Sequence, residues 1–175
     1  EGMMLVAALT SILSARASES ALLGFAGGIV GAGLIALVFG IFAIHLHADQ
    51  IVTGTAINLL AIGATSFVYR ELPSSLVTQL IAIKGSEAIV PLAWIVFPLV
   101  LAIVLWRTSF GLRLRACGEN PNAVVAAGHS VVAHRWLALA IEAVAAGLAG
   151  GYLSLAYSGF AENMTAGRGF IALSI

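Results

Sequence analysis

Long apolar runs separated by short polar segments dominate the pattern along this chain. Runs 21–44, 51–69 and 88–106 carry no charged side chain, and run 136–157 carries one. Each is close to the roughly 20 residues that a helix needs to cross a hydrocarbon core of about 30 Å. Run 2–15 is shorter, which indicates a half-helix or a span that begins before this sequence. The pattern predicts an all-α integral membrane protein, a polytopic helical bundle with about four to five transmembrane helices.

Composition agrees with a membrane protein and excludes other classes. The 175 residues are 61% hydrophobic and 9% charged, against roughly a quarter charged in soluble domains. Net charge is zero and the basic residues are scattered, so no patch can follow a phosphate backbone and nucleic acid is not an expected partner. The single cysteine, Cys117, excludes an internal disulfide and fits a reducing compartment.

Positive charge marks one loop as cytoplasmic. Arg107, Arg113 and Arg115 lie at one end of the polar segment 111–130, and Arg135 lies beyond its other end. Basic residues concentrate on the cytoplasmic side of membrane proteins. Alternation of the spans then places the segment 71–87 on the outer side.

The same loop contains the signals of a short, self-contained helix. Asn120 is a good N-cap, Pro121 suits the first helical position, and Gly128 allows a left-handed turn at the end. The alanines between them favour helix. We predict a surface helix of about two turns, which could be a simple connector.

The amino-acid sequence of this loop also resembles that of a known family. RACGENPNAVVAAG, residues 115–128, resembles the cytoplasmic loop of ABC-type importer permeases, the branch with branched-chain amino acid, simple sugar and nucleoside carriers. EGMML, ADQIVTGTAINLL and GRGFIALSI, which start at Glu1, Ala48 and Gly167, resemble the same family in the same order. The last two are most similar to the simple sugar and nucleoside branch.

The resemblance implies a transport subunit that is not an enzyme. It would carry a nucleoside or simple sugar across the bacterial cytoplasmic (inner) membrane by alternating access. The expected partners are ABC ATPase subunits, a second permease in a homo- or heterodimer, an extracytoplasmic substrate-binding protein and membrane lipid. The chain itself would bind no cofactor, with ATP and Mg on the ATPase subunit. Residues 1–175 would form a single transmembrane permease domain, truncated at both ends, with a re-entrant C-terminal segment.

In this family the cytoplasmic loop holds a coupling helix that docks into the ATPase. The residues that match it are Gly118, Glu119, Asn120, Pro121, Asn122, Ala123, Ala126, Ala127 and Gly128.

Four polar residues are candidates for the substrate pathway: Glu1, Thr55, Asn58 and Glu142. A buried amide such as Asn58 needs a partner, so an interhelical hydrogen bond that only fixes packing is an equal alternative. Glu142 lies within a span, where a bare charge costs several kcal/mol. It could pair with His134, Arg135 or another helix, contact substrate, or handle a proton.

Other interpretations stay open. A proton-coupled secondary transporter that uses Glu142 is the first alternative, a branched-chain amino acid importer permease is another, and a membrane scaffold comes third. His45 and His47 lack a complete ligand set, so no metal site is expected. Gly24 with Gly28, and residues 27 with 31, predict close helix packing within the chain. Residues 72–83 predict an amphipathic surface segment.

Overall fold

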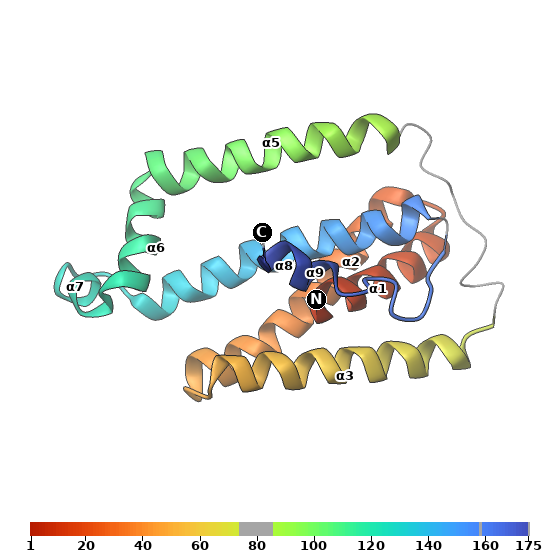
Figure 1. The fold of residues 1–175 in the computed structure, drawn as a ribbon, viewed down its shortest axis with the longest axis horizontal. Helices are drawn as coiled ribbons and strands as arrows, with labels where there is room; N and C mark the ends of the chain where they lie inside the picture. The colour runs from red at the N-terminus through yellow and green to blue at the C-terminus, as the bar shows by residue number, and fades with distance from the viewer. Residues whose placement is uncertain (74–85, 158, 175) are drawn as a thin grey trace. The chain divides into compact units, whose positions relative to one another are not determined.

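A computed structural model describes residues 1–73, 86–157 and 159–174, without the side chains of 86–94 and 172–174. Within these ranges every regular element is a helix (Figure 1). The helices are α1 (Gly2–Ser18), α2 (Ala21–Gly40), a π-helical turn (Ile41–His45), α3 (Gln50–Glu71), α5 (Ser86–Arg107), α6 (Ser109–Glu119), α7 (Pro121–Ala126), α8 (Val131–Ala156) and α9 (Arg168–Ser174). The amphipathic segment predicted over 72–83 lies mostly outside the described residues.

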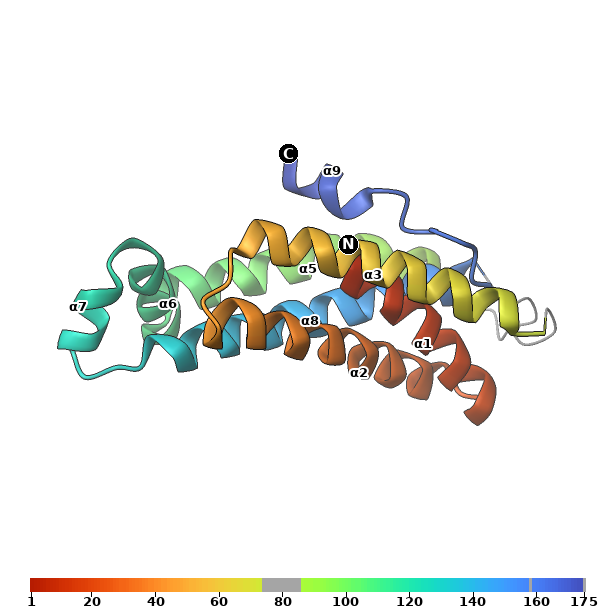
Figure 2. The same ribbon diagram turned by 90° about the horizontal axis from the view of Figure 1, so that it is seen from below.

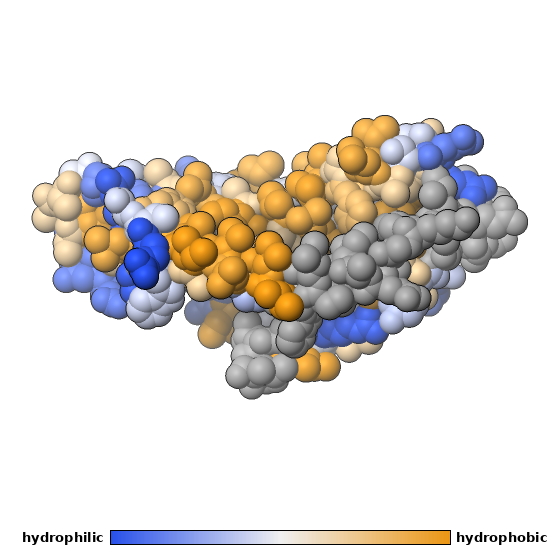
Figure 3. Space-filling view, turned by 90° about the horizontal axis from the view of Figure 1, so that it is seen from above, coloured by the Kyte–Doolittle hydropathy of each residue, from blue (hydrophilic) through white to orange (hydrophobic). Residues whose placement is uncertain are grey.

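The described helices include three that are long and apolar enough to cross a membrane, at Ala21–His45, Gln50–Glu71 and Val131–Ala156. Ile95–Arg107 and Ser109–Glu119 would make a fourth if this pair, bent by 77°, counts as one span. Large apolar side chains such as Leu59 lie exposed on these helices, and Figure 3 shows hydrophobic residues in orange over much of one face. The prediction of an all-α polytopic membrane protein is confirmed, with the count of four reached through the bent pair.

α8 begins earlier than the sequence predicts, at Val131 rather than Trp136. The helix is 26 residues long, so a rise of about 1.5 Å per residue places Glu142 roughly 16 Å from its first residue. Glu142 therefore lies near the middle of this helix.

The residues fall into two compact units, one made of 1–83 and 140–175 and the other of 84–139. In the first unit α1 packs against α2 and α3 (Figure 2). Its hydrophobic core joins Leu5, Ala8, Leu9 and Ile12 of α1 to Phe160, which follows α8.

Glycines bring the helices of the first unit into backbone contact. A Cβ atom on Gly28 of α2 would lie 2.9 Å from the carbonyl oxygen of Gly147 in α8, and one on Gly150 would lie 2.3 Å from the carbonyl oxygen of Met4. A Cβ on Gly24 would lie 2.7 Å from that of Ala15 in α1. The predicted use of the α2 glycines for packing within the chain is confirmed.

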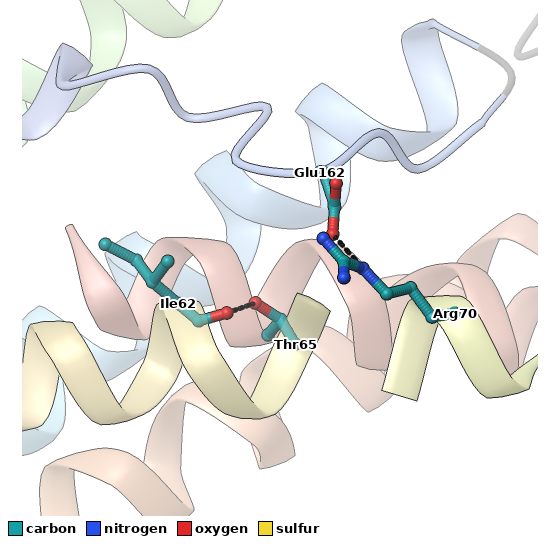
Figure 4. Close-up of polar contacts among 4 residues, drawn as sticks. All are labelled: Ile62, Thr65, Arg70 and Glu162. Carbon is teal, nitrogen blue, oxygen red and sulfur yellow. Dashed lines mark hydrogen bonds and ion pairs between the residues drawn. The ribbon is translucent and has the colours of Figure 1, made fainter. Parts of the chain in front are cut away.

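The C-terminal end of α3 is tied to the segment after α8. Arg70 Nε donates to Glu162 Oε1 at 2.9 Å (Figure 4), and the rings of Tyr69 and Phe160 lie 5.6 Å apart. Five residues before Arg70, the buried hydroxyl of Thr65 donates within α3 to the carbonyl oxygens of Ala61 at 2.7 Å and Ile62 at 3.2 Å. The segment after α8 is thus anchored by a ring contact as well as by an exposed ion pair, which alone adds little stability.

Candidate coupling helix and polar junction

The candidate coupling region begins with a sharp bend between α5 and α6. Thr108 caps α6, because its Oγ1 accepts a hydrogen bond from the Gly111 amide at 3.1 Å. Any side chain at Gly111 would meet the end of α5, since a Cβ there would lie 2.3 Å from the carbonyl oxygen of Val104. Glycine is therefore required for the backbones to approach this closely.

Two ring contacts brace the second unit. The guanidinium carbon of Arg115 lies 4.4 Å from the centre of the Trp106 ring, a cation–π contact that restrains α6 against the end of α5. The rings of Phe110 and His134 stack at 6.1 Å with an interplanar angle of 16°, which joins α6 to the first turns of α8.

The predicted short helix is present as α7, with the predicted caps. Asn120 Oδ1 accepts from the Ala123 amide at 3.2 Å, and Pro121 is the first helical residue. At the other end Gly128 has φ of 79° and donates to Val125 O at 2.9 Å. The His129 amide donates to Val124 O at 3.0 Å, which completes a Schellman motif.

The coupling candidates are displayed on the surface. All are exposed except Pro121, which is half-buried. Val124 is buried on the inner side of α7, whereas the neighbouring Val125 keeps 63% of its surface exposed. Val125 is therefore an exposed apolar contact point among small alanines. The sequence did not reveal it, because helical periodicity alone could not tell which of the two valines faces outward.

The first unit brings two of the four pathway candidates together. The Glu1 carboxylate accepts from the amides of Gly167 at 3.0 Å and Gly169 at 2.6 Å. The neighbouring amide, of Gly2, donates to Asn58 Oδ1 at 2.7 Å. These residues, which we call the polar junction, connect the starts of α1 and α9 to α3.

Thr55 and Glu142 have no described contact with the junction. Thr55 is exposed and its hydroxyl donates to Ile51 O of its own helix at 2.8 Å. Glu142 is exposed, and the described part of the chain gives its carboxylate no hydrogen bond or ion pair. The suggested pairing with His134 or Arg135 is not observed. His134 Nδ1 lies instead 2.7 Å from the Ser130 carbonyl oxygen.

The histidines near the start of α3 lie in a turn. His47 has φ of 54°, and its Nδ1 lies 3.0 Å from the carbonyl oxygen of His45. No group of three or more His, Cys, Asp or Glu side chains that could hold a metal ion occurs among the residues described.

Several long apolar helices, with a capped, exposed helix between two of them in the sequence, define a multi-pass membrane protein. The whole chain, residues 1–175, matches the family described as branched-chain amino acid transport system / permease component, and the chain belongs to that family.

Three curated relatives are named as ABC transporter permease proteins. The chain is 32% identical over 201 residues to a guanosine ABC transporter permease protein of Bacillus subtilis, covering 99% of this chain and 63% of the relative. It is also 32% identical over 195 residues to a putative glucose ABC transporter permease protein of Haloferax volcanii, covering 100% and 59%. A nucleoside ABC transporter permease protein of Lactococcus lactis is 32% identical over 168 residues, covering 85% of this chain and 53% of the relative.

The chain thus spans between about half and two thirds of the length of these relatives. No solved structure matches it significantly.

Proposed function

We propose that this chain is the membrane-spanning permease subunit of an ATP-driven importer for a nucleoside or a simple sugar. Family membership supports the permease class. The family description names branched-chain amino acids, but the three curated relatives above are named for guanosine, glucose and nucleosides. We therefore infer a hydroxylated solute.

The observation that carries the proposal is α7. A helix of 6 residues is too short to be stable alone, yet this one is closed at both ends by side-chain and Schellman caps. Its outer surface is Val125 amid the small side chains of Ala123, Ala126 and Ala127. A narrow, rigid and partly apolar projection suits insertion into a cleft of another protein.

The proposal assigns the partners by chemistry. α7 transmits the closing motion of an ATPase that holds ATP and Mg, while the outer surface receives solute from a binding protein. A second permease, identical or related, completes the path. The arginines at 107, 113, 115 and 135 favour the cytoplasmic side for α7, in the inner membrane.

The test is uptake by the full-length permease, reconstituted with its ATPase and binding protein, using adenosine, glucose and leucine as separate solutes. ATP-dependent uptake of adenosine or glucose is expected. Uptake of leucine alone would contradict the solute class, and uptake without ATP would contradict the importer class.

Ala126→Trp tests the role of α7 in the same system. The added ring projects from an exposed position, so we expect normal insertion with loss of ATPase co-purification, or retained assembly with uptake reduced at least about tenfold, equal to roughly 1.4 kcal/mol. Ala17→Trp, at an exposed position near the end of α1, is the matched control. Assembly and uptake equal to wild type in Ala126→Trp would overturn the coupling role.

A further inference from the structure

The Glu1 carboxylate joins segments that are far apart in the sequence. It accepts hydrogen bonds from Gly167 and Gly169, and its two oxygens each take one amide, at 3.0 Å for Oε1 and 2.6 Å for Oε2. A charged acceptor makes such bonds shorter and stronger than neutral ones. Glu1 therefore holds the start of α9 at the start of α1.

The depth of this contact follows from α3. Gly2 is bonded to Asn58, which lies about 12 Å along α3 from its first residue at the helical rise. The segment 159–167 begins beside Tyr69, near the other end of α3, where Phe160 and Glu162 are anchored. It therefore returns along α3 from its C-terminal end to the level of Asn58, the course of a segment that re-enters a span.

The junction is built closely around the carboxylate. A Cβ atom on Gly169 would lie 2.6 Å from Glu1 Oε2, and Gly167 has φ of 79°, so both positions favour glycine. The hydroxyl of Thr165 is fully buried in the same junction and interacts with the Glu1 carboxylate.

The carboxylate also has unused capacity. Two ionised oxygens can accept about four hydrogen bonds, and the amides of Gly167 and Gly169 use one on each oxygen. The Asn58 oxygen accepts from Gly2, while its amide nitrogen has no described acceptor. Donors and acceptors of this kind, adjacent to one another, match a pair of neighbouring hydroxyl groups.

We propose that Glu1 is a latch whose carboxylate holds α9 across the transport path through Gly167 and Gly169, and that neighbouring hydroxyls of the solute release it by replacing these two amide donors. This inference rests on the proposed function, because nucleosides and simple sugars both carry such hydroxyl pairs. Glu1 thus both positions α9 and distinguishes solutes by their hydroxyls, and the anchor at Phe160 acts as the fixed end of the movement.

The movement is tested by spin labels on the full-length permease, one at Leu59 of α3 and one at Phe170 of α9, both exposed, in a Cys117→Ser background. Glu1→Gln keeps the shape but turns one acceptor oxygen into a donor. We expect a broader and longer distance distribution than in wild type without solute.

Glu162→Gln is the matched control, because it removes a carboxylate from the same segment while the Tyr69 and Phe160 rings still hold that end. It should keep the wild-type distribution. A wild-type distribution in Glu1→Gln, or equal broadening in both variants, would overturn the latch.

The hydroxyl requirement is tested by uptake of adenosine against 2′,3′-dideoxyadenosine. Wild type should favour adenosine in kcat/KM by at least about tenfold, and Glu1→Gln should bring the ratio close to one, since a site built for hydroxyls rejects an analogue without them. Equal discrimination in both proteins would overturn the hydroxyl requirement. Failure of wild type to take up either adenosine or glucose would contradict the proposed solute class, while the spin-label comparison would still decide whether Glu1 holds α9.

Discussion

The two compact units of the chain use small residues in opposite ways. In the first unit, Gly28, Gly147 and Gly150 are buried and let helix backbones touch. In the second, Ala123 and Ala126 are exposed on α7, so no described helix covers them. The first set makes room for a neighbour already present in the chain, whereas the second leaves room for one outside it.

This difference teaches how to separate packing from docking in a membrane protein. Without a hydrophobic drive between spans, small residues at helix contacts supply close van der Waals packing. Outside the spans, an exposed small-residue surface has no such internal purpose. The same residue type thus indicates fold in one unit and function in the other, and burial decides between them.

The largest effect is expected from Gly150→Ala, which disrupts the close backbone packing of the first unit. The new Cβ would lie 2.3 Å from Met4 O, so the α1 and α8 backbones must separate, at a cost of about 1–3 kcal/mol for overpacking. The measurement is the thermal midpoint in detergent, followed by size-exclusion chromatography.

Gly33→Ala is the control for that change, because a Cβ at Gly33 has nothing within 4 Å. Because alanine favours helix more than glycine, this substitution should leave the midpoint unchanged or raise it slightly. Equal midpoints in Gly150→Ala and wild type would contradict backbone packing at this site.

A smaller effect is expected from Glu142→Gln. This substitution tests whether an exposed polar residue of the first unit takes part in transport. Its carboxylate makes no hydrogen bond or ion pair to the described residues, so neutralising it removes no bond within them. We expect ATP-driven uptake to be kept, with the same pH profile as wild type. Loss of a pH-dependent uptake in a folded, assembled protein would favour a proton-coupled carrier.

Local chemistry predicted the parts of the site that depend on adjacent residues. Asn120, Pro121 and Gly128 specify α7 through caps that span only a few positions, and the apolar runs specify the spans. Even there, the helix starts were misplaced at α8, because Val131 and the residues after it carry mixed polarity that gives no clear boundary.

Contacts between distant residues could not be predicted. Glu1 and Gly169 meet across 168 positions, and only the path of the chain after α8 brings them together. The outward direction of Val125 also depends on how α7 packs against α6. The sequence named Glu1 and Asn58 as polar residues of interest but not the glycine amides that bind Glu1.

The most direct test of the central claim is site-specific photo-cross-linking from Val125 in the assembled, full-length transporter. A photoreactive residue there replaces a side chain that is 63% exposed on α7, and the same residue at Leu22, 77% exposed in the first turn of α2, is the control. We predict an adduct with the ATPase subunit from Val125 and none from Leu22, which the charge pattern places at the outer end of its span. A transport-active complex that gives no ATPase adduct from Val125, or gives it from Leu22 instead, would contradict α7 as the coupling helix.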